Sequence, residues 1–240
     1  DTIMGMSLPH GGHLTHGWKV NFSARFYRAV QYPVAQATGL IDYRAVAALA
    51  REHKPKIIMC GASAYPRTLD FNAFAEIARE VGAYLVADIA HIAGLIAAGV
   101  HPSPIAVADA VTTTTHKSLR GPRGAMIMCP ARHAKAIDNA VFPALQGGPH
   151  NHTTAAMAVA FREALAPEFK VYGRRVVDNA RALAEELVKL GFTLVTGGTD
   201  NHIVLMDLRE KGYGGKPLAE ALERAGIICN CNSVPFDTRK

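Results

Sequence analysis

The feature that most constrains this chain is an alternation of short apolar segments with amphipathic segments of about ten residues. Four segments have the apolar and β-branched character of buried strands, namely residues 57–60, 83–87, 110–115 and 125–129. Residues 43–54 and 71–81 have helical spacing, with Asp42 and Asp70 as candidate N-caps and Gly82 as a stop signal. Strands that alternate with helices form βαβ units, so we expect an α/β fold with a mostly parallel central sheet flanked by helices.

The last third of the sequence predicts a smaller unit. Its expected elements are helices over residues 151–166, 171–190 and 217–225 and strands over 192–195, 203–208 and 227–230. We place the domain boundary within the first two of these helices, which gives a large domain of residues 1–165 and the beginning of a smaller α/β domain over 166–240. Residues 1–23 are rich in Gly and His with little periodicity, and we expect a loop with short strands there.

Composition excludes several classes of protein. The 240 residues are 49% hydrophobic and 19% charged, which is typical of a globular chain and not of a disordered one. The longest nearly pure apolar run, residues 92–100, is far shorter than the ~18 residues of a membrane-spanning helix. The net charge of +6 is spread along the chain, so we expect no nucleic-acid tail but a surface that suits an anionic ligand.

Cysteine usage indicates a reducing compartment. The chain has only four cysteines, and we expect reduced thiols and a cytoplasmic location. Cys229 and Cys231 lie two residues apart in a strand-like segment, on one face, where a mutual disulfide is geometrically unfavourable.

Polar side chains follow three of the predicted strands. Ser63 follows the first, Asp88 and then His91 follow the second, and His116 and Lys117 follow the third. A lone aspartate at such a position is usually a helix cap. Because ligands bind outside the carboxyl ends of parallel strands, the convergence of these five side chains predicts a functional site instead.

Lys117 is the sharpest candidate for chemistry. It follows a buried strand and has His116, Arg120 and Arg123 close in sequence, and desolvation and like charge would disfavour its ammonium form. Such a lysine can act as an amine nucleophile and form a Schiff base. Spacing alone leaves an ordinary surface lysine equally open. Asp88, one crossover away, would complement a pyridoxal phosphate cofactor by keeping its ring nitrogen protonated.

Two glycine-containing segments and a histidine cluster leave alternatives open. Residues 121–124 and 146–149 could offer backbone N–H groups to a phosphate, or could be plain turns. His10, His13 and His16 could bind zinc, but they lie in a glycine-rich loop without nearby carboxylates or zinc-type cysteine spacing. We therefore expect no metal, and favour one imidazole stacked on a planar ligand that the glycines allow to approach closely.

Eight ordered segments together resemble serine hydroxymethyltransferase, a fold-type I pyridoxal-phosphate enzyme. They include VTTTTHKSLRGPRG and AYLVADIAHIAGLIAAG, and they span residues 1–17, 52–56, 61–65, 83–99, 111–124, 140–149, 197–202 and 232–237. Essentially the whole chain is covered. The resemblance implies the large domain of a fold-type I transferase and the start of its small domain.

The resemblance also implies roles for matching residues. Lys117 would carry pyridoxal phosphate as a Schiff base, Asp88 would pair with the pyridine nitrogen, and His13 would stack on the cofactor ring. His116 would lie beside the lysine and influence substrate choice. The further implied site residues are Ser63 and His91 near the phenolic oxygen, Gly147 and Gly148 toward the phosphate of a neighbouring subunit, Leu8, Gly12, His13, Leu14 and Asn232 on the folate side, and Arg123 in support.

The implied activity transfers a one-carbon unit between serine and tetrahydrofolate, giving glycine and 5,10-methylenetetrahydrofolate, in a homodimer with shared sites. Two alternatives are a related aldolase (threonine aldolase or an α-methylserine-type transferase) and an inactive core without the substrate-binding residues. One departure is Cys231, where the family typically has a lysine. Because family chains begin before Asp1 and continue past Lys240, we expect an internal portion, without the upstream tyrosine and glutamate and the downstream arginine that binds the substrate carboxylate.

Overall fold

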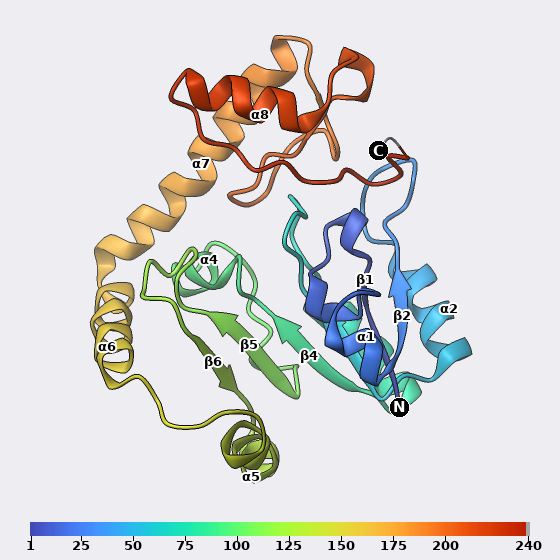
Figure 1. Cartoon of the computed structure of the whole chain (residues 1–240), viewed down its shortest axis with the longest axis vertical. Coiled ribbons are helices and arrows are strands. Elements are labelled where there is room, and N and C mark those ends of the chain that lie inside the picture. The colour runs from blue at the N-terminus through green and yellow to red at the C-terminus, as the bar shows by residue number, and fades with distance from the viewer. Residues whose placement is uncertain (239–240) are drawn as a thin grey trace.

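The centre of the molecule is a six-stranded sheet. The structure is a computed structural model and describes residues 1–238. Its strand order is β2-β1-β3-β4-β5-β6 (Figure 1). The strands are β1 (Thr2–Met6), β2 (Arg28–Tyr32), β3 (Ile57–Cys60), β4 (Tyr84–Asp88), β5 (Ala110–Thr114) and β6 (Ala125–Met128). Only the β5–β6 pair among them is antiparallel, so the expectation of a mostly parallel sheet is confirmed.

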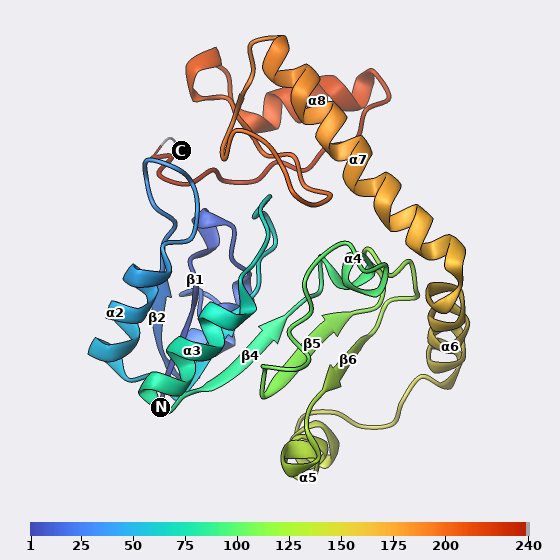
Figure 2. The same ribbon diagram turned by 180° about the vertical axis from the view of Figure 1, so that it is seen from behind.

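Helices connect the strands and cover the sheet. The α-helices are α1 (Phe22–Phe26), α2 (Tyr43–His53), α3 (Phe71–Val81), α4 (Ala93–Ala97), α5 (Ala131–Asn139), α6 (Asn151–Leu165), α7 (Pro167–Lys189) and α8 (Gly215–Arg224). Shorter helical turns are η1 (Leu8–His10), η2 (Leu14–His16), η3 (Ala140–Leu145) and η4 (Arg209–Lys211). Figure 2 shows α2 and α3 side by side over one face of the sheet.

Helices α2 and α3, which have the clearest sequence signals, begin directly after the aspartates that we predicted as their N-caps. The Asp42 carboxylate accepts hydrogen bonds from the first backbone N–H groups of α2, and Asp70 does the same for α3. Gly82 ends α3 in the left-handed conformation, at φ 68°. The apolar faces of both helices then pack on the sheet, where Phe74 of α3 and Ile58 of β3 are fully buried.

The N-terminal segment contributes more to the sheet than its sequence indicates. β1 lies inside the sheet, with β2 and β3 as its parallel neighbours. Met4 and Met6 are fully buried. Gly5 permits a close approach, because a Cβ there would lie 2.6 Å from the backbone oxygen of His16. The expected loop with short strands is therefore a central strand followed by η1, η2 and α1.

The smaller unit follows the long helix α7, which links it to the rest of the molecule (Figure 1). It contains the antiparallel pair β7 (Thr193–Leu194) and β8 (Met206–Asp207), and α8. α7 begins at Pro167, four residues before the predicted start, because a proline is favoured at the first position of a helix. The division at residues 165/166 stays a prediction, and the last two residues of the expected unit lie outside the described part.

The predicted strand over residues 227–230 is wrong. Within residues 1–238 this segment pairs with no strand, and Ile228 is 87% exposed. A run of apolar residues forms a strand only where a neighbour pairs its backbone groups. Cys229 and Cys231 are consequently exposed in an irregular segment, and all four cysteines are free thiols. Within residues 1–238, no helix is long and apolar enough to cross a membrane.

Candidate active site

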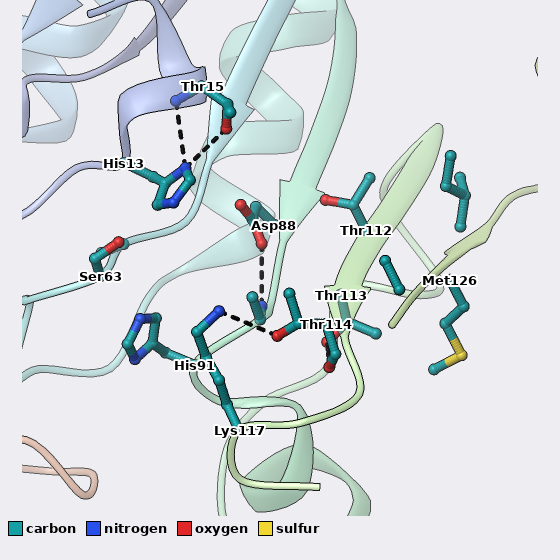
Figure 3. A pocket seen from close by; sticks show the side chains of 14 residues that line it. His13, Thr15, Ser63, Asp88, His91, Thr112, Thr113, Thr114, Lys117 and Met126 are labelled. Atoms are coloured by element: carbon teal, nitrogen blue, oxygen red, sulfur yellow. Dashed lines mark hydrogen bonds between the residues drawn. The ribbon is translucent and has the colours of Figure 1, made fainter. Parts of the chain in front are cut away.

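A cavity of about 300 Å³ opens at the carboxyl ends of the parallel strands (Figure 3). Its walls come from the loop after β1, the ends of β3, β4 and β5, and the antiparallel strand β6. The lining residues are His13, Thr15, Ala62, Ser63, Asp88, Ala90, His91, Thr112, Thr113, Thr114, Lys117, Ala125, Met126 and Ile127. The position matches the rule that open α/β sheets bind ligands at this edge.

Lys117 lies in the loop between β5 and β6 and projects into the cavity (Figure 3). Its Nζ donates a hydrogen bond of 3.2 Å to Oγ1 of Thr114. The expected crowding by Arg120 is wrong, since the Arg120 guanidinium lies 4.4 Å from the centre of the Tyr172 ring of α7. Arg120 has a positive φ of 61°, and this turn directs it to the helix.

Asp88 is the last residue of β4, not the residue after it, and its carboxylate is held by two donors. Oδ1 accepts a hydrogen bond of 3.0 Å from the backbone N–H of Ala90, and Oδ2 lies 2.9 Å from Nε2 of His16. Burial by itself would raise the pKa of this carboxyl. The hydrogen bond and charge of His16 and the Ala90 N–H outweigh burial, so the pKa lies below its ordinary value and Asp88 is ionised.

A glycine allows the ends of β3 and β4 to approach each other closely beside Asp88. Gly61, directly after β3, has φ +150°, and a Cβ there would lie 2.2 Å from the backbone oxygen of Asp88. No other residue type fits without moving one of the two chains. Gly61 therefore sets where both Ser63 and Asp88 meet the cavity.

His13 faces the cavity with a defined ring orientation. Its Nδ1 accepts a hydrogen bond of 3.3 Å from the backbone N–H of Thr15 and lies 2.8 Å from the Thr15 hydroxyl. Because a backbone N–H can only donate, Nδ1 carries no proton and the neutral ring is protonated at Nε2. Burial and the positive charges of His16 and Lys117 lower the pKa of His13, while Asp88 opposes the shift.

His91 lines the opposite part of the cavity, close to Lys117 in Figure 3. Burial lowers its pKa to about 4, and the charges of Lys117 and His202 act in the same direction. His91 is therefore neutral at pH 7, and its ring can either donate or accept a hydrogen bond to a ligand.

The structure brings five of the predicted residues to one cavity, namely His13, Ser63, Asp88, His91 and Lys117. His116 does not line it. Its Nε2 lies 3.3 Å from Nη1 of the exposed Arg123, and slight burial with the charges of Lys117 and Arg123 lowers its pKa. These two side chains form a separate pair beside the lysine.

Apart from His13, the predicted phosphate and folate residues do not line the cavity. Gly147 and Gly148 are exposed between η3 and α6, and a Cβ on either would meet no atom within 4 Å. Of the folate-side set, Leu8 and Leu14 begin η1 and η2, Gly12 is buried between them, and Asn232 is exposed near the end of the described chain.

Sequence reasoning missed His16 as part of the site. This ring is 1% exposed and reaches Asp88 across 72 residues of sequence. The only signal was its place in the histidine cluster, for which we expected an imidazole stacked on a planar ligand and no metal. Thr15, Thr112, Thr114 and Met126 were also missed as lining residues. Strand alternation would have identified only part of the β5 contribution, because it puts Thr113 on the other face from Thr112 and Thr114 although all three line the cavity.

His13, His16 and Asp88 each place a potential metal-ligand atom within 4.8 Å of the other two. In this arrangement the Asp88 oxygen and the His16 nitrogen are already joined by a hydrogen bond. The absence of a metal from the site stays a prediction.

The donor set of the cavity fits pyridoxal phosphate. Lys117 supplies an amine for an aldehyde, and ionised Asp88 supplies a partner for a protonated ring nitrogen. The flat ring of His13 faces the same space (Figure 3), and small residues such as Ala62 and Ala90 leave room for a planar group. The fold and this set of side chains together define the class of fold-type I pyridoxal-phosphate transferases.

Within this class the family is specific. A family model described as "Serine hydroxymethyltransferase" matches residues 1–240, and the chain belongs to this family. It is 62% identical over 240 residues to the protein named serine hydroxymethyltransferase from Sorangium cellulosum (strain So ce56), covering all of this chain and 57% of that protein. It is 63% identical over 240 residues to the one from Acidothermus cellulolyticus (strain ATCC 43068 / DSM 8971 / 11B), covering all of this chain and 56% of that protein. The chain thus spans just over half the length of these curated relatives.

Proposed function

We propose that this chain is the cofactor-binding part of an enzyme that interconverts serine and glycine and transfers the one-carbon unit to tetrahydrofolate. The observation that carries the proposal is the convergence of Lys117, Asp88 and His13 on one cavity at the carboxyl edge of the sheet. Membership of the serine hydroxymethyltransferase family supports the same conclusion.

In this proposal three residues hold the cofactor. Lys117 Nζ attaches it, the Asp88 carboxylate keeps the ring nitrogen protonated, and His13 covers one face of the ring. When bound, pyridoxal phosphate supplies an electron sink for breaking a bond at the α-carbon of the amino acid. The chain's own contribution is to keep Asp88 ionised through His16 and to orient the His13 ring through Thr15.

Neighbouring residues would assist. His91 is neutral at pH 7, so it can hydrogen-bond with a phenolic oxygen without adding positive charge beside Lys117. Ser63 offers a hydroxyl at the same cavity. The His116–Arg123 pair lies beside the lysine, where it would contact the substrate and support its orientation.

The folate side would be formed by two segments that meet in space. The ring of Phe236 lies 4.5 Å from that of His10, which follows Leu8 in η1, and this contact supports the proposal that the two segments act together. We propose these residues as contacts for tetrahydrofolate, with Cys231 in place of the lysine usual in the family.

We further propose a homodimer in the cytoplasm. Gly147 and Gly148 are exposed and distant from their own cavity, which suits a loop that reaches the phosphate in a second subunit. Phe142 and Leu145, just before this loop, are 61% and 81% exposed, as expected of side chains that a partner covers. Four free cysteines suit a reducing compartment.

The experiment uses the purified protein that contains this chain. Pyridoxal phosphate should bind and give an absorbance band in the near-visible range, and Lys117→Ala should abolish the band while Lys135→Ala, an exchange on exposed α5, should keep it. Conversion of serine to glycine should depend on tetrahydrofolate. Folate-independent cleavage would favour a related aldolase, and a protein that takes up no cofactor would overturn the proposal.

A further inference from the structure

His202, in the loop between β7 and β8, reaches from the smaller unit to the wall of the cavity. Its ring stacks on that of His91, with the ring centres 5.9 Å apart and the planes inclined by 16°. This offset, nearly parallel geometry is a favoured arrangement of two flat rings. Among residues 1–238, no hydrogen bond holds the His91 side chain, so the stack is a directional contact on a ring that otherwise lacks one.

The backbone that carries His202 is fixed by its preceding neighbour. Asn201 is 1% exposed, and its Nδ2 donates a hydrogen bond of 3.1 Å to the backbone oxygen of Tyr65. Its Oδ1 accepts a hydrogen bond of 2.9 Å from the backbone N–H of Ile203. The buried side-chain amide of Asn201 therefore holds the backbone at Ile203, directly after His202, in a fixed position relative to Tyr65.

Asp200 and Thr199 extend this attachment. Asp200 Oδ1 accepts a hydrogen bond of 2.9 Å from Nη1 of Arg67, and Oδ2 accepts one of 3.1 Å from the backbone N–H of Thr68. The hydroxyl of Thr199 donates to the backbone oxygen of Pro66 at 3.1 Å. Residues 199–201 are therefore hydrogen-bonded to residues 65–68, which fixes the backbone from which the His202 ring projects.

We propose that His202 is a positioning residue for His91, which fixes the His91 ring in the orientation that meets the cofactor. This role rests on the proposed function, because it gives the smaller unit a direct part in shaping the pyridoxal phosphate site. Burial lowers the pKa of both rings, so they stack as neutral groups without mutual repulsion.

The test compares three variants of the protein that contains this chain. His202→Ala removes the stacking ring, whereas His202→Phe keeps a flat ring of similar size. His133→Ala is the matched control, since the half-buried His133 also contacts an aromatic ring, that of Tyr84, but does not line the cavity. A general packing defect would appear in His133→Ala as well.

The first readout needs no cofactor. Carbon-proton NMR spectra of the histidine rings, with the His91 signal assigned through His91→Asn, should show a ring-current shift of His91. His202→Ala should abolish this shift, and His202→Phe and His133→Ala should keep it. An unchanged His91 signal in His202→Ala would overturn the proposed stack, whatever the protein binds.

The second readout is the bound cofactor. His202→Ala should weaken pyridoxal phosphate binding by about two- to tenfold, the value of one aromatic pair, and shift the absorbance maximum. In a His91→Asn background the same exchange should have no further effect, because the two residues act through one contact. An effect that persists without His91, or one that His133→Ala reproduces, would overturn the positioning role. Loss of cofactor uptake by the unmodified protein would instead contradict the proposed function.

Discussion

The Nε2 atom of His16 lies 2.9 Å from Oδ2 of Asp88. The imidazole is 1% exposed and does not line the cavity, whereas the carboxylate does. His16 therefore acts on the site through its neighbours, by its hydrogen bond to Asp88 and by its charge on His13. A buried carboxylate keeps its negative charge only if neighbouring groups replace its hydration, and this pair, with the Ala90 N–H, provides that replacement.

Replacing His16 with Phe should raise the pKa of Asp88, because burial is then no longer opposed by the hydrogen bond and charge of the imidazole. The free energy of unfolding should also fall by about 1–3 kcal/mol, since a buried acceptor loses its donor. Both effects can be measured without cofactor, by NMR titration of labelled aspartates and by urea denaturation. In an Asp88→Asn background the stability loss should be smaller, and an equal loss would show that the ring contributes only packing.

Asp88→Asn should leave the fold intact and lower turnover by at least about 100-fold, equivalent to ~2.7 kcal/mol of barrier. The amide cannot keep the pyridine nitrogen protonated, although it can occupy the same space. The measurement is kcat with saturating pyridoxal phosphate. Asp109→Asn is a suitable control, because Asp109 precedes β5 and contacts Arg132 of α5 outside the cavity. Equal turnover in both variants would contradict the role of Asp88.

Gly61→Ala should be strongly destabilising, by about 2–4 kcal/mol, because its Cβ would meet the Asp88 backbone oxygen at 2.2 Å with φ at +150°. Gly82→Ala provides the comparison, because Gly82 also has a positive φ but a Cβ there meets nothing within 4 Å. Chemical denaturation gives the free energy of unfolding of both variants. The loss in Gly82→Ala measures the cost of the positive φ alone, and the additional loss in Gly61→Ala measures the cost of the contact with Asp88. Similar losses in the two would show that the contact with Asp88 has no separate cost.

Acidification should destabilise the cofactor-free protein partly through His91. Its folded-state pKa of about 4 lies below the ordinary value of 6.5. Between these values the unfolded chain binds a proton that the folded chain does not, so the free energy of unfolding falls as pH falls from about 6.5 toward 4. The contribution of His91 is fully present above about pH 6.5 and amounts to at most ~3 kcal/mol, less where solvent reaches the ring.

The check is the difference in urea-derived stability between pH 7.5 and pH 4.5 for the unmodified protein and for His91→Phe. The variant should lose less stability on acidification, because phenylalanine does not titrate. His152→Phe on the exposed face of α6 should behave as the unmodified protein does. An identical pH dependence in all three would contradict the burial of a neutral His91.

Much of the architecture was predictable because it depends on local chemistry. Asp42, Asp70 and Gly82 mark helix ends through hydrogen bonds and backbone conformations within a few residues of themselves. The placement of Asp88 and Lys117 at one edge follows from the right-handed, parallel crossovers that alternating elements impose. For these features the sequence neighbourhood contains the physical cause.

Predictions failed where the outcome depended on distant partners. Residues 227–230 resemble a strand, but no strand in the described part of the chain pairs with them. Arg120 is close to Lys117 in sequence, yet the rings of α7 attract it away. A pattern read over a few neighbouring residues contains no information on whether a second strand will pair with residues 227–230 or whether the Tyr172 ring will contact Arg120.

The α/β class, the family resemblance and the residues able to carry an amine-and-carboxylate chemistry can be inferred from the order of residues alone. Two contacts could not be inferred in this way, namely the support of Asp88 by His16 and the stacking of His202, from the smaller unit, on His91. Both contacts join segments far apart in the chain, and their free energy appears only when the sheet has formed and α7 has returned the smaller unit to the cavity. The candidate residues therefore form one site only through packing between segments that are distant in the sequence, and no local sequence pattern shows that packing.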